Sequence, residues 1–285
     1  MLVKFIKEIE EIPTPDFQVQ QIINIASNPD SSIKDLEKAI SMDASLSLKV
    51  LKLVNSAYYG LPRKITKISE AVMILGFKTV RNLALSIFTY SSLNKGASNV
   101  DKKKLWQHFM STAIISEVVS KIIGYPEQEE AFMAGLLHDI GKIVLDIAFP
   151  KYITSLVEKS KSNKVCFYTL EKKLGEETHG ELGAFLIEQW KLPELFQIVS
   201  LYHDEPENND QEAFDTILYI VHLANYFSDL MYNGYSGSYC EPTLSAKTFK
   251  VLGIKPSDLI DISIKIRNAL AKAKALLEGG EENES

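Results

Sequence analysis

The sequence predicts an all-α protein. Apolar residues recur with the helical period along most of the chain, and no well-separated run alternates with the two-residue period of a strand. One apolar helix face has the spacing i, i+3, i+4 and i+7: Ile68, Ala71, Val72 and Leu75. A second face of helical spacing carries a histidine: Leu105, His108, Thr112, Ile115 and Val119.

Three places carry the signals of a helix start. A proline followed by a glutamate occurs at 126–127 and again at 193–194, and proline is favoured in the first turn of a helix. Thr178 and Glu181 have the spacing of a capping box. This pattern predicts that His179 lies in the first turn of its helix.

Composition narrows the class of protein. The 285 residues are 46% hydrophobic and 24% charged, as in an ordinary soluble protein of about two domains. A net charge of −6 disfavours a protein whose main role is to wrap nucleic acid. The beginning of the sequence has no signal-peptide core, and no apolar run approaches the length of a membrane span. We therefore expect a cytoplasmic protein that does not act at a membrane.

Cys166 and Cys240 are the only cysteines. Two are too few for a disulfide framework or a thiolate zinc site, and neither has a basic neighbour in sequence that would activate a thiolate. We expect both to be inert thiols in a reducing compartment.

The histidines form the first candidate site. Four of the five in the chain lie on the apolar faces of four different predicted helices: His108, His138, His179 and His203. Four imidazoles that converge with a carboxylate suit a divalent transition metal such as Fe, Mn, Ni or Zn. A single histidine on an apolar face is more often a core residue bonded to a backbone carbonyl. The metal interpretation therefore depends on Asp139, which directly follows His138.

Longer motifs point to a family. The segment "HDIGK", 138–142, resembles the central motif of the HD superfamily of metal-dependent phosphohydrolases. Upstream, "LVNSAYYG", "ISEAVMILG" and "VRNLALS" match in order and spacing the amino-terminal part of HDOD domains, an HD-related family of bacterial signalling proteins. "HGELGAFLIEQWKLPE" and "IVHLAN" continue the resemblance, which covers about residues 8–230. It implies a multi-helix HD-like array with an amino-terminal helical subdomain.

The resemblance also implies domain limits. We expect the amino-terminal helical part of the HDOD domain at 1–100 and an HD-like helical core at 101–232. A carboxy-terminal helical extension is expected at 233–277, followed by a disordered tail at 278–285.

The same resemblance implies a ligand set. The expected metal ligands are His108, His138, Asp139, His179 and His203, the last two matching metal histidines of the HD-GYP relatives that cleave cyclic dinucleotides. Lys142 matches the lysine that can contact a substrate phosphate in those relatives.

Several positions depart from that pattern. Asn225, a weak ligand, replaces the last aspartate of the HD pattern, and Lys104 replaces a glutamate of the HD-GYP relatives. Asp204 stands where those relatives have the second histidine of a pair, and no "GYP" follows it. These departures disfavour a dinuclear hydrolase. They leave two alternatives, a single metal or a metal-free hydrogen-bonded network.

A second candidate site is a group of cations: Arg63, Lys64, Lys67, Lys78 and Arg81. These residues could form a patch that binds an anion or a partner, although the solvated face of two amphipathic helices is the more common arrangement. Nucleic-acid binding through 63–81 is the third and least favoured interpretation of the chain.

The sequence thus supports two main functions. The first is a non-catalytic regulatory module of HDOD type that acts through signalling proteins or a small nucleotide-like ligand, with or without one divalent metal. The alternative is a metal-dependent phosphohydrolase that acts on a nucleotide or cyclic dinucleotide. Whether the chain is an enzyme stays open at this point.

Overall fold

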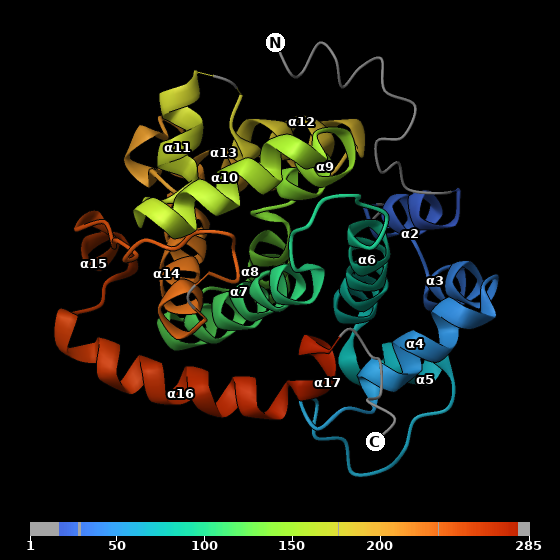
Figure 1. Cartoon of the computed structure of the whole chain (residues 1–285). Coiled ribbons are helices and arrows are strands. Elements are labelled where there is room, and N and C mark those ends of the chain that lie inside the picture. The colour runs from blue at the N-terminus through green and yellow to red at the C-terminus, as the bar shows by residue number, and fades with distance from the viewer. Residues whose placement is uncertain (1–16, 28–29, 176, 233, 279–285) are drawn as a thin grey trace. The chain divides into compact units, whose positions relative to one another are not determined.

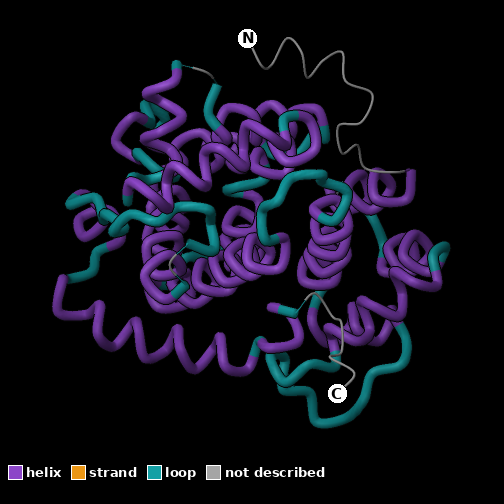
Figure 2. Tube along the Cα trace, in the orientation of Figure 1, coloured by secondary structure: helices purple, strands orange, loops and turns teal. Residues whose placement is uncertain are grey.

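The computed structural model describes residues 17–27, 30–175, 177–232 and 234–278. This part of the chain contains α-helices and short 3₁₀ turns and no strand, so the predicted all-α class is confirmed (Figure 2). The predicted disordered tail lies outside the described residues except for Glu278. None of the described helices is both long enough and apolar enough to cross a lipid bilayer.

The chain divides into two compact units, and the larger one includes residues 93–270. Its helices are α7 (Lys102–Ile123), α8 (Gln128–Leu137), α9 (Gly141–Ala148), α10 (Pro150–Asn163), α11 (Phe167–Leu174), α12 (His179–Gln189), α13 (Glu194–Tyr202), α14 (Asp215–Met231), α15 (Lys247–Leu252) and most of α16 (Leu259–Lys272). The 3₁₀ turns are η1 (Pro206–Asn208), η2 (Glu212–Phe214) and η3 (Pro256–Asp258).

Helix α7 forms the centre of this unit. It packs along α8, and both helices contact α14 (Figure 1). Helix α12 packs against α9 and α13, and α13 also contacts α8 and α14. Because most of the side chains of α7 are buried, polar residues on it must find partners inside the protein.

The smaller unit includes residues 17–92 and 271–278. It holds α2 (Phe17–Ser27), α3 (Ile33–Ser41), α4 (Ala44–Val54), α5 (Ile68–Leu75), nearly all of α6 (Phe77–Leu93) and α17 (Lys274–Leu277). Helix α3 contacts α2, α4 and α5, which pack as a small helical cluster.

The predicted helix starts agree with the structure. Helix α8 begins at Gln128, and Pro193 is the N-cap of α13. Thr178 caps α12 in a reciprocal capping box with Glu181, so His179 is the first residue of that helix. The sequence signals therefore place three of the histidine-bearing segments correctly, those of His138, His179 and His203.

Gly141 allows α9 to approach α12 closely. A Cβ atom at this position would overlap the backbone carbonyl oxygen of His179 and lie 2.7 Å from the backbone nitrogen of Gly183. Any side chain here would push apart α9, which begins two residues after Asp139, and α12, which carries His179.

The prediction of two unpaired cysteines is wrong. Cys166 and Cys240 form a disulfide across a sequence separation of 74 residues, with their Cα atoms 4.9 Å apart. The pairing depends on that tertiary approach, which no local sequence pattern reveals.

Candidate metal centre and cavity

Four histidines and one aspartate meet in the interior of the larger unit. His108 lies within α7, His138 is the C-cap of α8, His179 begins α12, and His203 is the C-cap of α13. The exposed fraction is 2% or less for each histidine and 1% for Asp139. The structure thus brings together all five residues that the sequence singled out as ligands.

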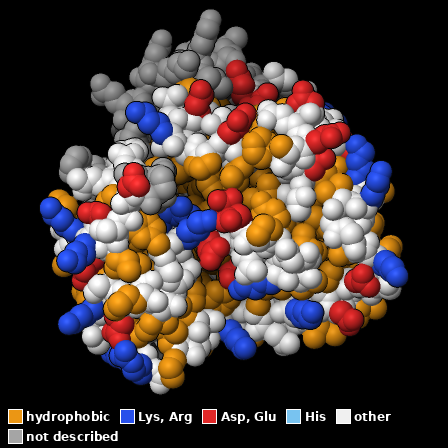
Figure 3. Space-filling view, turned by 180° about the vertical axis from the view of Figure 1, so that it is seen from behind, with side chains coloured by type: hydrophobic (Ala, Val, Ile, Leu, Met, Phe, Trp, Pro, Cys, Tyr) orange, Lys and Arg blue, Asp and Glu red, His pale blue; other side chains and the backbone are white. Residues whose placement is uncertain are grey.

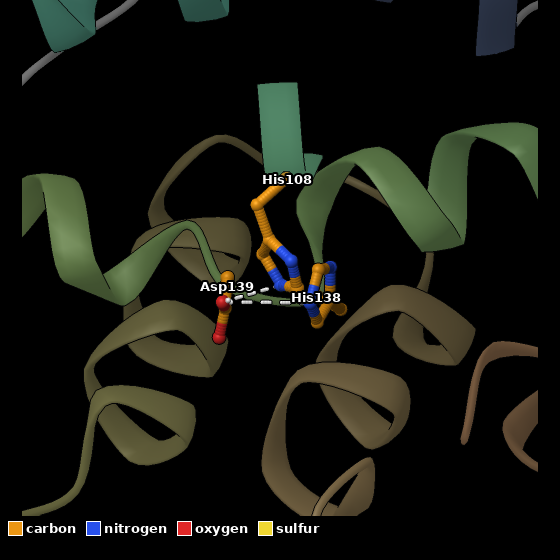
Figure 4. Close-up of side chains that lie close together, drawn as sticks. All are labelled: His108, His138 and Asp139. Carbon is orange, nitrogen blue, oxygen red and sulfur yellow. Dashed lines mark hydrogen bonds and ion pairs between the residues drawn. The ribbon is translucent and has the colours of Figure 1, made fainter. Parts of the chain in front are cut away.

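His108 and His138 form what we call the inner pair. Their Nε2 atoms are 3.1 Å apart, and Oδ2 of Asp139 lies 3.2 Å from Nε2 of His108 and 3.5 Å from Nε2 of His138. Figure 4 shows the two rings and the carboxylate directed toward one another.

His179 and His203 form the cavity pair. Their Nε2 atoms are 3.3 Å apart, and the other carboxylate oxygen of Asp139, Oδ1, lies 3.0 Å and 3.5 Å from them respectively. Asp139 therefore stands between two histidine pairs and presents one oxygen to each. Each pair with Asp139 makes a ligand set of the size and type that binds a divalent ion.

Hydrogen bonds at Nδ1 fix the tautomer of two of these histidines. Nδ1 of His138 is 2.7 Å from the carbonyl oxygen of Gly135, and Nδ1 of His203 is 3.0 Å from that of Ser200. A carbonyl oxygen can only accept, so each Nδ1 carries the proton. In the neutral ring, Nε2 then offers a lone pair to the centre.

Nδ1 of His108 also carries the proton, because of hydrogen bonds with the hydroxyl groups of two serines. Ser111 donates its hydroxyl proton to the carbonyl oxygen of His108, so in the 2.6 Å contact between Ser111 and Ser228 the donor is Ser228. Ser228 Oγ must then accept from Nδ1 of His108 at 3.1 Å. His108 also directs its Nε2 lone pair inward.

Glu171 orients His179. Its carboxylate accepts from the backbone N–H of His179 at 2.8 Å and lies 2.6 Å from Nδ1. A carboxylate on the far nitrogen of a metal-binding histidine is a common arrangement, because it fixes the ring and raises ligand basicity. Burial alone would lower the pKa of His179, but Glu171 and Asp139 raise it well above its usual value.

Lys142 distinguishes the two oxygens of Asp139. Its Nζ donates to Oδ2 at 2.6 Å, and the lysine is only 4% exposed. Burial alone would raise the pKa of Asp139, but Lys142 and His138 hold it well below its usual value, so the carboxylate is charged. Oδ1 forms no contact with that ammonium, and its close partners among the described residues are the Nε2 atoms of His179 and His203. The inner pair thus shares its oxygen with a fixed ammonium, whereas the cavity pair faces an oxygen that only imidazoles approach.

A cavity of 60 Å³ adjoins the cavity pair. Its lining includes Lys142, His179, His203, Asp204 and Asn225, but neither member of the inner pair. Oδ2 of Asp204 is 3.4 Å from Nε2 of both His179 and His203, and the side chain of Asp204 is 27% exposed. Burial would raise the pKa of Asp204, but His203 and His179 lower it, so a second carboxylate is available at this pair.

Asn225 also lines the cavity, with its Oδ1 buried and without a hydrogen-bond partner among the described residues. Asp229 lies one helical turn further along α14, with Oδ1 3.6 Å from Nδ1 of His108. Burial raises the pKa of Asp229.

His222, the fifth histidine, is not available as a ligand. Its Nδ1 donates to the carbonyl oxygen of His203 at 2.7 Å, and its Nε2 accepts from the backbone N–H of Ser245 at 3.0 Å. Both nitrogens are occupied, and burial lowers the pKa of the ring.

The predicted cation patch lies in the smaller unit, so it is not part of this centre. Arg63 pairs with Glu70, and Arg81 donates from Nε to Asn82 at 2.9 Å and is half-buried. Basic and acidic side chains are interspersed on the face seen in Figure 3. Anion or partner binding by this patch stays a prediction.

Sequence reasoning missed the partners that orient the histidines. Glu171 lies eight residues before His179, whereas Ser228 and Ser200 reach His108 and the carbonyl oxygen of His138 from helices far away in sequence. Nothing in the local context of these three residues marks them. Asp204 was noticed only as a departure from a histidine, although its carboxylate reaches both Nε2 atoms of the cavity pair.

A comparison with protein families identifies the family to which the chain belongs. The family model for the HDOD domain matches residues 12–206, more than half of the chain. The chain belongs to the HDOD domain family. The match includes all five clustered residues but ends before Asn225 and before the Cys240 segment.

Relatives of this HDOD protein share its sequence or its fold. An uncharacterized protein of Treponema pallidum (strain Nichols) is 28% identical over 222 residues, which are 77% of this chain and 42% of the relative. The chain therefore spans less than half of that relative's length.

Two solved structures have the same fold. An HDOD domain protein of unknown function from Geobacter sulfurreducens superposes with a TM-score of 0.78 at 23% identity, covering 94% of this chain and 96% of the other. A Shewanella amazonensis protein, named provisionally as a phosphohydrolase, has a TM-score of 0.77 at 22% identity and covers 98% of both chains. At these identities the likeness establishes the HDOD fold alone.

Proposed function

We propose that this chain is a regulatory HDOD module of bacterial signal transduction that holds one divalent transition metal at the cavity pair. It acts by binding signalling proteins or a small ligand rather than by turnover. The observation that supports the metal is the unequal treatment of the two oxygens of Asp139. Oδ2 is bonded to the ammonium of Lys142, whereas Oδ1 is approached only by the imidazoles of His179 and His203 among the described residues.

The donor set fits such an ion. His179 and His203 contribute two nitrogens, and Asp139 and Asp204 contribute two carboxylates. Facing lone pairs 3.3 Å apart need a cation between them, either a proton or a metal. Nitrogen and oxygen donors favour Fe, Mn, Ni or Zn over Mg or Ca. When bound, the ion would supply positive charge between the two carboxylates.

The dimensions of the cavity argue against catalysis. Sites for nucleotide-sized ligands usually measure about 300–1,000 Å³, far above the 60 Å³ found beside the cavity pair. Among the described residues, Lys142 is the only lysine or arginine that lines this cavity, and its ammonium is already paired with Asp139. A substrate phosphate would meet the carboxylates of Asp204 and Asp229 here, and the described lining offers no further lysine or arginine to hold it.

A metal-dependent phosphohydrolase is the second candidate. It is favoured by one observation, the position of four Nε2 atoms around a single bridging carboxylate, because metal sites that activate water are built from such ligands. In that case a lining segment would have to move so that a nucleotide could enter.

Elemental analysis and turnover assays together test the proposal. We expect the purified protein to contain, or to take up on reconstitution, one equivalent of Fe, Mn, Ni or Zn. The loaded protein should hydrolyse cyclic dinucleotides and nucleotides no faster than the matched Asp139→Asn variant. Turnover that disappears in Asp139→Asn and in His138→Ala would establish the hydrolase instead. Absence of metal after reconstitution would overturn the metal centre.

A further inference from the structure

The disulfide lies beside the cavity pair. Cys166 is the N-cap of α11, and Cys240 lies in the chain between α14 and α15. Both cysteines line the cavity, and both are half-buried. The covalent link thus borders the space into which His179 and His203 face.

The segment that carries Cys240 forms one wall of that cavity. We call residues 236–243 the cover segment, because its lining residues are Ser236, Ser238, Cys240, Pro242 and Thr243. It belongs to no helix, so its position depends on contacts with other parts of the chain.

Besides the disulfide, noncovalent contacts join the cover segment to α10 and α11, and the ammonium groups of Lys161 and Lys164 each lie 5.9 Å from the centre of the Tyr239 ring. The backbone N–H of Phe167 donates to Oγ of Ser238 at 3.1 Å, and that of Tyr239 donates to Oγ of Ser160 at 2.9 Å. Each is a neutral hydrogen bond to a serine, which is weak compared with a covalent bond. The ring of Phe167, next to Cys166, lies 5.7 Å from the ring of His179.

We propose that Cys166 and Cys240 form a reversible redox switch that controls access to the cavity pair. In the oxidised form the disulfide fixes the cover segment as a wall of the cavity. A dithiol reductant donates two electrons and two protons, the S–S bond breaks, two S–H groups form, and the reductant becomes a disulfide. The cover segment is then held only by noncovalent contacts, and the cavity opens to ligands too large for the closed form.

This inference rests on the cavity and the disulfide alone. It does not require a bound metal and holds whether the chain is a regulator or a hydrolase. It can therefore be tested on metal-depleted protein, and its failure would leave the metal centre untouched.

The experiment compares the metal-depleted full chain in its oxidised form and after reduction by dithiothreitol. Thiol titration in denaturant should find no free thiol in the first and two in the second. Hydrogen–deuterium exchange should then rise about tenfold at the amides of Phe167 and Tyr239 on reduction, because their acceptors lie across the opened contact. Amides of α7 and α8 should not change.

Carbethoxylation of histidines gives the second readout. His179 and His203 should react faster in the reduced protein, whereas His108 and His138, which do not line the cavity, should not change. The Cys240→Ser variant should behave as reduced protein with or without reductant, and reduced wild type provides the same comparison if that variant does not fold.

Three outcomes would overturn the switch. The first is two free thiols in the oxidised sample. The second is an intact disulfide whose reduction leaves exchange at Phe167 and Tyr239 and the reactivity of His179 and His203 unchanged. The third is increased exchange throughout α7 and α8, since that would make the disulfide a general structural staple.

Discussion

The inner pair and the cavity pair contain the same chemical groups and share one carboxylate, yet their surroundings differ. The Nε2 atoms are 3.1 Å apart in the inner pair and 3.3 Å apart in the cavity pair. The inner pair meets the oxygen of Asp139 that Lys142 already holds, and it does not line the cavity. The cavity pair meets the other oxygen, has a second carboxylate in Asp204, and lines the cavity.

This difference shows that ligand identity alone does not decide where an ion binds. At the inner pair a buried ammonium already supplies the positive charge that Asp139 needs. At the cavity pair, no lysine or arginine among the described residues forms an ion pair with Oδ1 of Asp139 or with Asp204, which leaves room for a metal. The predictions below test this assignment.

The largest losses of stability and of metal binding are expected from Asp139→Asn, because this carboxylate contacts both histidine pairs. The change leaves the ammonium of Lys142 buried without a counter-charge, which should lower the free energy of unfolding by about 3–5 kcal/mol. Metal content should fall to background. Urea denaturation and elemental analysis measure the two effects.

A double variant separates the two roles of Asp139. Asp139→Asn combined with Lys142→Met removes both buried charges, so it should recover much of the lost stability without recovering metal. If the double variant binds metal as wild type does, Asp139 is not a ligand.

Single histidine variants should show which of the two pairs binds the metal ion. His179→Ala should reduce metal affinity about 100-fold or more, because it removes a donor at the proposed ion. His138→Ala should reduce the free energy of unfolding by about 2 kcal/mol through the lost buried contacts, but change affinity by less than about tenfold. Isothermal titration with the metal ion measures the affinities. The opposite ranking would place the ion at the inner pair.

Metal affinity should depend on pH through the cavity pair. The pKa of His179 is raised well above its usual value, so near neutral pH the metal-free ring holds a proton that the ion must displace. Affinity should therefore fall as pH falls, by up to about tenfold per pH unit. Burial lowers the pKa of His138, so a site that depended on this ring would show a flatter profile through neutral pH.

Changes to the residues that orient the histidine rings should lower metal affinity less than changes to the ligands, and not equally in the two pairs. Glu171→Gln should lower metal affinity by about 10–100-fold, because it replaces the carboxylate on Nδ1 of His179. Ser228→Ala, the matched change behind His108, should leave affinity nearly unchanged. Similar losses of metal affinity in both variants would contradict the assignment of the ion to the cavity pair.

The smallest effect on stability and on metal binding is expected from a change in the capping box of α12. Thr178→Ala should cost about 1 kcal/mol of stability and weaken metal binding slightly, because it loosens the first turn that carries His179. Ser32→Ala removes the corresponding cap of α3 in the smaller unit. Thermal unfolding should register both changes, and metal titration only the first.

Much of the fold could be read from the sequence because its signals are local. The helical period, the capping box at Thr178 and the proline at 193 each depend on neighbouring residues, and each marks an element of the structure. The apolar faces that carry His108 and His203 indicated their burial for the same reason.

The rest of the centre depends on tertiary approach. The disulfide of Cys166 with Cys240 joins segments that meet only in the folded chain. Glu171 and Lys142 are close in sequence to His179 and Asp139, but the atoms that they contact are set by how the intervening turns fold. No spacing rule distinguishes the two histidine pairs, because the difference between them is one of burial and neighbouring charge.

Anomalous diffraction from crystals soaked in Mn²⁺ or Zn²⁺ tests the central claim most directly. The account predicts one anomalous peak within bonding distance of His179, His203 and Oδ1 of Asp139, and none between His108 and His138. A peak between His108 and His138, or no peak at the cavity pair in crystals that contain the metal, would contradict it.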